Sequence, residues 1–187
     1  MKKGTLLSLI ILSSVQCTKK ESKTAETTLK TEVSLDSLKS YAEKTKVLLA
    51  SQLTQKIKDS GTVGALEFCN IEALPLTKSM SDQYHLEIKR VSNKNRNSNQ
   101  YANEEERKYI EMYKAQLLKG EKLKPTKTET HFYAPIVTNT MCLQCHGEKG
   151  KDIKPDVLAT ITVLYPNDKA TGYKENEVRG LMSIKFK

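Results

Sequence analysis

The sequence predicts an α+β fold in which helices flank an antiparallel sheet. Three segments have strand-like sequences, at residues 85–92, 130–138 and 178–187. Between them lie segments whose apolar residues recur every three or four positions, which is the period of an amphipathic helix. Strands that are separated along the chain and mixed with helices favour an α+β architecture over an all-helical one.

The composition is that of a protein with one modest hydrophobic core. The chain has 187 residues, of which 37% are hydrophobic and 28% charged, enough for one ordinary domain behind a short leader. The formal net charge is +9, but the basic residues are spread along the chain without a long basic run. We therefore expect no nucleic-acid binding, and attraction to anionic lipid headgroups is the simpler alternative.

Residues 1–17 are predicted to form a signal peptide that resembles the bacterial lipoprotein type. Two lysines follow the initial methionine, and the apolar run behind them is too short for a comfortable membrane span. Cys17 would be acylated and become the mature N-terminus. Residues 18–33 are rich in Lys, Glu, Thr and Ser and predict a flexible tether, which leaves residues 34–187 for the domain. The expected location is the periplasm or outer cell envelope, with a lipid anchor in the membrane.

The first half of the domain predicts two consecutive helices. Residues 34–60 carry one apolar stripe, with Ser34 as the N-cap and Gly61 as the stop. Residues 63–73 predict a second helix that ends before Pro75, because the residue before a proline is disfavoured in helical conformation. The first of these helices needs no explanation beyond packing on a core.

The second half predicts two more helices between the strands. Asn103 caps a helix whose first turn holds three glutamates, which suit the helix dipole, and that helix runs to about Lys119. The last helix is predicted over residues 156–165, with Pro155 in its first turn as the residue that starts it. The segment 93–103 is a polar loop.

The most specific motif is Cys142-Leu143-Gln144-Cys145-His146. Two cysteines separated by two residues, with histidine directly after, form the attachment signature of c-type haem. Each thiol adds across one vinyl group of the haem, and the histidine then lies beneath the iron as a ligand. Half of a zinc site and a redox dithiol are the alternatives, but the sequence offers no second Cys or Cys/His pair with zinc spacing. Export supports the haem reading, because this attachment takes place outside the cytoplasm in bacteria.

Cys69 is the remaining cysteine that needs an explanation. It lies within the apolar residues of the predicted second helix, where a cysteine is usually a small buried hydrophobe. From the pattern alone, that structural role is favoured over contact with the iron.

Several stretches together resemble a family of bacterial single-haem c-type domains with a PAS-like fold, known from a cyanobacterial haem protein and from the sensor regions of membrane histidine kinases. The resemblance covers the domain from Ser34 to Lys187. The matching stretches are Cys69, Arg90-Val91-Ser92, Arg96-Asn97, Ala102-Asn103, Tyr133-Ala134-Pro135-Ile136, Cys142-Leu143-Gln144-Cys145-His146-Gly147, Tyr165-Pro166, Asp168, Ala170, Gly172-Tyr173-Lys174 and Arg179-Gly180.

The resemblance implies a PAS-like antiparallel sheet with flanking helices around one covalent haem c. It also implies that His146 and Cys69 hold the iron, and an electron-rich thiolate would stabilise ferric iron. Among histidines, His131 is the strongest alternative for the sixth ligand, ahead of His85. Arg96 is a candidate partner for the haem propionates, since guanidinium binds carboxylate through two parallel hydrogen bonds; Arg90 and Lys94 are alternatives.

The sequence therefore predicts an exported, lipid-anchored haem c protein that senses redox state or a diatomic gas. A redox or signalling protein, of unknown identity, would have to read its state. A simple electron-transfer cytochrome is the alternative function. We expect no enzymatic activity, because a peroxidase-like site would need an acid–base histidine beside an open iron, and only His131 or His85 could serve.

Overall fold

The computed structural model describes residues 33–186, together with Met1. The predicted signal peptide, Cys17 and all of the predicted tether except Val33 lie outside the described residues. No helix in the described part is long and apolar enough to cross a membrane. In chain order the elements are α1 (Leu35–Tyr84), β1 (Glu87–Val91), the 3-10 helix η1 (Ser98–Gln100), α2 (Glu104–Leu118), β2 (Thr126–Lys127), β3 (His131–Val137), α3 (Thr140–His146), α4 (Pro155–Leu164) and β4 (Val178–Lys185).

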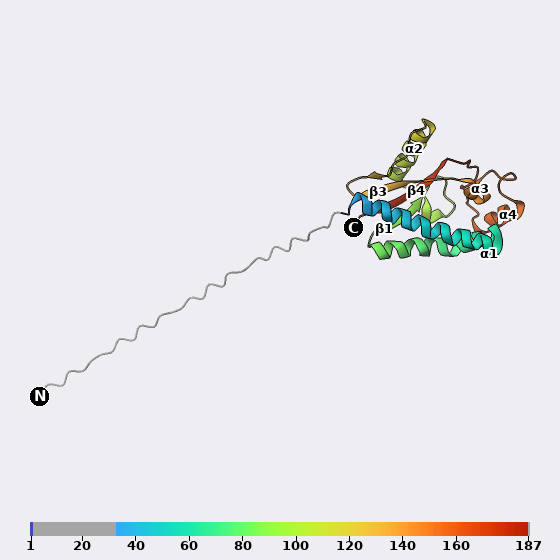
Figure 1. The fold of residues 1–187 in the computed structure, drawn as a ribbon. Helices are drawn as coiled ribbons and strands as arrows, with labels where there is room; N and C mark the ends of the chain where they lie inside the picture. The colour runs from blue at the N-terminus through green and yellow to red at the C-terminus, as the bar shows by residue number, and fades with distance from the viewer. Residues whose placement is uncertain (2–32, 187) are drawn as a thin grey trace. The chain divides into compact units, whose positions relative to one another are not determined.

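Helix α1 is folded back on itself at Gly61 (Figure 1). Gly61 has φ 69° and ψ −175°, a conformation that is essentially restricted to glycine. It divides α1 into a first arm, residues 35–60, and a second arm, residues 62–84. The arms run antiparallel, and the rings of Tyr41 and Tyr84 stack with their centroids 4.0 Å apart. The prediction of a helical stop at Gly61 is therefore confirmed.

The predicted end of the second helix before Pro75 is wrong, because the second arm continues through Pro75 to Tyr84. A proline inside a helix removes one hydrogen bond and crowds the preceding turn. The turns that follow nevertheless bury Thr77 and Met80. The Ala73 carbonyl accepts hydrogen bonds from Thr77 Oγ1 at 2.8 Å and from Arg90 Nη2 at 3.4 Å. Tertiary packing thus outweighs the local cost of the proline.

The four strands form one antiparallel sheet in the order β1-β4-β3-β2. The C-terminal strand β4 lies in the middle, where Leu181 pairs with Val91 of β1 and with Pro135 of β3. The three predicted strands and the α+β architecture are confirmed. Strand β2 was not predicted, since two residues are too few to show alternation.

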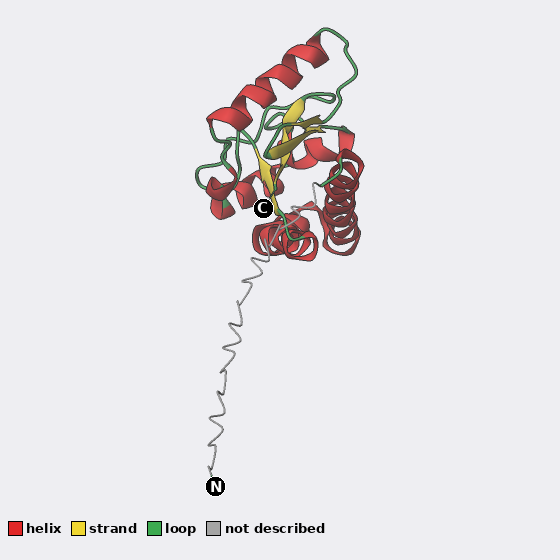
Figure 2. Ribbon diagram, turned by 90° about the vertical axis from the view of Figure 1, so that its left-hand side faces the viewer, coloured by secondary structure: helices red, strands yellow, loops and turns green. Residues whose placement is uncertain are grey.

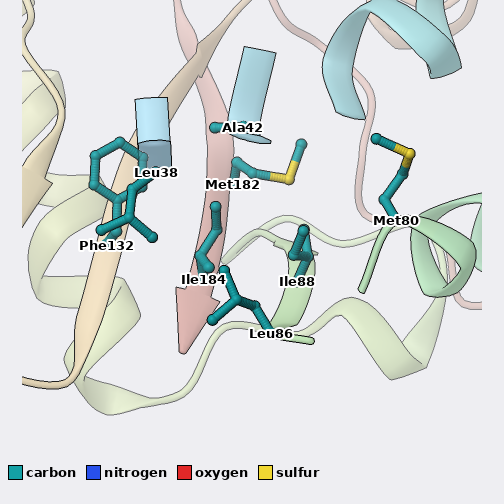
Figure 3. Close-up of a cluster of buried hydrophobic side chains, with 8 residues drawn as sticks. All are labelled: Leu38, Ala42, Met80, Leu86, Ile88, Phe132, Met182 and Ile184. Atoms are coloured by element: carbon teal, nitrogen blue, oxygen red, sulfur yellow. The ribbon is translucent and has the colours of Figure 1, made fainter. Parts of the chain in front are cut away.

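The sheet lies between α1 on one face and α2 on the other (Figure 2). Side chains alternate along β4, so that Met182 and Ile184 contact α1 whereas Leu181 contacts α2. The α1 face is shown in Figure 3, and its buried residues are Leu38, Ala42, Met80, Leu86, Ile88, Phe132, Met182 and Ile184. The α2 face buries Val91, Ala102, Ile110, Tyr113, Tyr133, Val178 and Leu181.

Helix α2 begins with a capping box that joins Asn103 and Glu106. Asn103 Oδ1 accepts from the Glu106 amide, and Glu106 Oε2 accepts from the Asn103 amide, both at 2.9 Å. We expect Asn103→Ala to lower the free energy of unfolding by about 1 kcal/mol, because the helix loses its cap. Urea denaturation measures this. Asn99→Ala, at an exposed position in η1, is the control, and equal effects of the two substitutions would contradict the prediction.

Candidate functional site

The Cys142–His146 motif forms most of the short helix α3, beside the end of α1 where its two arms join (Figure 1). Asn139 caps α3, and its Oδ1 accepts from the Cys142 amide at 3.2 Å. Two threonines of α1 contact side chains of α3. Thr54 Oγ1 lies 3.7 Å from Met141 Sδ, and Thr62 Oγ1 lies 3.0 Å from Gln144 Oε1. The two arms of α1 thus fix the orientation of the motif.

Cys145 points into a small apolar cluster. This third cluster consists of Leu66, Ile153, Val157 and Ile161, and Cys145 packs against it. Burial raises the pKa of the Cys145 thiol to about 11, although Arg96 opposes the shift. Cys142 is half-buried, with its Sγ 3.2 Å from Asn139 Oδ1. The Cys145 thiol therefore lies among side chains of α4 and of the second arm of α1.

The ring of His146 is held by a backbone carbonyl. Its Nδ1 lies 2.7 Å from the Ala170 oxygen, and because a carbonyl can only accept, Nδ1 must donate. Burial lowers the pKa of His146 well below its usual value, and Arg179 and Arg96 lower it further. The imidazole is therefore neutral, with its proton on Nδ1 and a free lone pair on Nε2. This is the tautomer that metal-ligating histidines use when the other nitrogen is held by a hydrogen bond.

Cys69 lies on the second arm, one helical turn after Leu66. Its half-buried thiol is close enough to Cys145 to contribute to the raised pKa of Cys145. Burial raises the pKa of Cys69, whereas Arg90 and Arg96 act in the opposite direction. The structure therefore places Cys69 near Cys145 of the motif.

The two alternative histidines lie elsewhere. His131 opens β3, whereas α3 follows the far end of that strand, roughly 20 Å away at the rise of a β-strand. Its Nδ1 lies 2.8 Å from Thr130 Oγ1, and its ring is parallel to that of Tyr133. His85 follows the second arm at the end away from Gly61 and is exposed. The structure does not bring either histidine to the motif.

Arg96 forms a buried ion pair with Asp168. Its Nε lies 3.1 Å from Asp168 Oδ1, its Nη2 lies 3.3 Å from Oδ2, and Nη2 also donates to the Cys145 carbonyl at 2.5 Å. The two side chains are only 9% and 7% exposed. Arg96 therefore reaches the predicted site, but these donors already bind a carboxylate and the motif's own backbone. We had not predicted the contributions of Asp168 and Ala170, although both occur in the stretches that carry the family resemblance.

The described residues form no metal-binding cluster of their own. Within residues 33–186 there is no group of three or more His, Cys, Asp or Glu side chains placed to hold a metal ion. The zinc alternative therefore gains no second set of ligands from the described part of the fold.

Comparisons with known proteins agree with this fold. None of the curated proteins matches the chain. Among solved structures, the crystal structure of the cyanobacterial heme-protein Tll0287 matches with a TM-score of 0.60 and 17% identity, over 81% of this chain and 93% of that one. At this identity the match shows a shared fold. The model of the Tll0287-like family matches residues 16–186, so the resemblance inferred from the sequence is confirmed, and the chain belongs to the Tll0287-like family.

Proposed function

We propose that this chain binds one haem c through Cys142 and Cys145, with His146 as an axial ligand. The observation that carries the proposal is the hydrogen bond from His146 Nδ1 to the Ala170 carbonyl, which leaves the lone pair of Nε2 available in the residue that directly follows the two cysteines of the motif. The structural relative is a heme-protein, and the donor set of two thiols and a neutral imidazole suits the same group. When bound, the haem supplies a one-electron redox couple.

Cys69 is proposed as the second axial ligand. Its place on the second arm, near Cys145, supports this assignment. Burial raises the pKa of Cys69, and Arg90 and Arg96 act against that rise; only the thiolate is a metal ligand. The two arginines therefore favour the ligating form of Cys69.

We further propose that the protein is a sensor of redox state or of a diatomic gas in the cell envelope, and not an enzyme or a nucleic-acid-binding protein. Cys69 lies between Gly61 and Pro75, two positions where regular helical hydrogen bonding is interrupted. A change in what Cys69 contacts can therefore move the segment between them without unfolding α1. A partner protein would read that movement. Acylation of Cys17 would keep the protein at the membrane, and labelling with radioactive palmitate tests that anchor.

The decisive experiment compares absorption and EPR spectra of the haem-loaded protein and Cys69→Ala, in the ferric and ferrous states. We expect a low-spin ferric form with thiolate character that is lost in Cys69→Ala and unchanged in the control, His131→Ala. Loss of that character on reduction supports a sensor, whereas retention in both states favours an electron-transfer cytochrome. A spectrally silent Cys69→Ala would refute Cys69 as a ligand.

A further inference from the structure

Three arginines from different segments converge on the candidate site. Arg90 lies beside the second arm of α1. Its Nη2 donates to the carbonyl of Ala73, and Ala73 is one helical turn after Cys69. Arg179 lies on the His146 side: its guanidinium is 5.3 Å from the ring centroid of Tyr173, and that ring meets the His146 ring edge-on at 6.4 Å. Arg96 lies beneath the Cys145 carbonyl.

The hydrogen bonds of these arginines are unequal. Arg96 is paired with Asp168 through two donors. Arg179 Nη1 donates to the Lys94 carbonyl at 3.0 Å, and Arg90 has the 3.4 Å contact with Ala73. The Nε atoms of Arg90 and Arg179 are buried, and neither finds a hydrogen-bond partner among the described residues. Among the described residues, the two cations are therefore enclosed with neutral partners only, namely the two carbonyls and, for Arg179, also the side chain of Tyr173.

Such an arrangement is costly unless an anion completes it. A buried charge without a counter-charge costs several kcal/mol, and a buried donor without an acceptor adds about 1–3 kcal/mol. The cost here is increased by repulsion, since each of these arginines lies close enough to another for its charge to disfavour the other. In this cluster of described residues, Asp168 is the carboxylate in contact with a guanidinium, and it serves Arg96.

We propose that Arg90 and Arg179, and not Arg96, bind the two propionate carboxylates of the haem. This inference rests on the proposed haem binding. Two guanidinium groups without a carboxylate partner among the described residues match two carboxylates in number and charge, and guanidinium holds a carboxylate through two parallel hydrogen bonds. Arg90 lies close to Cys69 and to Arg179, and Arg179 contacts the Tyr173 ring that meets His146, so the two cations lie together beside the proposed axial ligands. Arg96 is left with a positioning role at the motif backbone.

The test measures haem content first and propionate ionisation second. Wild type, Arg90→Gln, Arg179→Gln and the double variant are produced with covalent haem, which is quantified as the pyridine haemochrome. The reduction potential is then followed across the pH range in which carboxylic acids titrate. Neighbouring cations lower a carboxylic acid pKa by about one to three units. We therefore expect the pH-dependent step of the potential to move upward by about one pH unit or more in each Gln variant.

Three further variants separate this role from a structural one. Arg90→Lys and Arg179→Lys keep the charge and are expected to restore most of the wild-type step. Arg107→Gln is the control, because Arg107 is also half-buried and donates to a carbonyl, that of Ala102 at 2.7 Å, but on α2. It should leave the step in place.

Two results would overturn the assignment. The first is a haem-loaded double variant with an unchanged step, or a step that moves in Arg96→Gln instead. The second arises if the Gln variants do not retain haem. In that case the Lys variants are the test, and loss of haem from the Lys variants as well would show that these side chains act through packing and not through their charge. A wild-type protein without haem would defeat the proposed function itself, and the first measurement detects that separately.

Discussion

Arg96→Ala is expected to lower the free energy of unfolding by about 3–5 kcal/mol, because it removes one partner of a buried ion pair. Asp168 would keep a hydrogen bond from the Ala170 amide at 3.0 Å, but its carboxylate would remain enclosed without a counter-charge. The Cys145 carbonyl would lose its guanidinium donor at the same time. We therefore expect less covalent haem per chain in this variant, since the backbone of the motif is no longer held.

A double-mutant cycle with Asp168→Asn isolates the pair. If the ion pair is responsible, Arg96→Ala/Asp168→Asn should be more stable than Arg96→Ala alone, since the unpaired charge is gone. Arg107→Ala is the matched control, because it removes a guanidinium that donates to the Ala102 carbonyl and has no such buried carboxylate contact; we expect a loss of about 1 kcal/mol there. Equal losses for Arg96→Ala and Arg107→Ala in urea denaturation would contradict the prediction.

Gly180→Ala is expected to destabilise the protein by about 3 kcal/mol or more, at the upper end of what overpacking costs. A Cβ at this position would meet the Val91 carbonyl oxygen at 2.2 Å and Ser92 Cβ at 3.2 Å. The first of these atoms belongs to the backbone of β1 and cannot rotate away. Strands β1 and β4 would have to separate at the end of the ladder, next to the hydrogen bond from Ser92 Oγ to the Arg179 carbonyl.

The position of Arg179 makes this variant informative beyond stability. If β1 and β4 separate there, both Arg90 and Arg179 shift, and the pH-dependent step of the reduction potential should move as it does in the arginine variants. Gly120→Ala is the control, since a Cβ there meets nothing within 4 Å and only the positive φ of 73° opposes it, a cost of about 1–2 kcal/mol. A Gly180→Ala protein as stable as Gly120→Ala would show that the strands can accommodate the methyl group.

The secondary structure was largely predictable because it depends on local patterns. The apolar stripe before Gly61, the cap at Asn103 and the alternation along β4 each reflect hydrogen bonding or packing within a few residues of the chain. The prediction failed at Pro75, where the local rule is correct on average but distant contacts of Thr77 and Met80 keep the helix intact. The length of α1 was therefore decided by packing and not by propensity.

The site divides in the same way. The sequence by itself determined which two thiols and which histidine are proposed to hold haem, because covalent haem attachment requires a fixed spacing that a linear motif displays. Only the tertiary structure decided that Ala170 orients His146, that Arg96 is occupied by Asp168, 72 residues away, and that Arg90 and Arg179 have no carboxylate partner within residues 33–186. A backbone carbonyl has no sequence signature, and the partner of a buried charge depends on which strands become neighbours. Placing β4 between β1 and β3 is what brings these groups together.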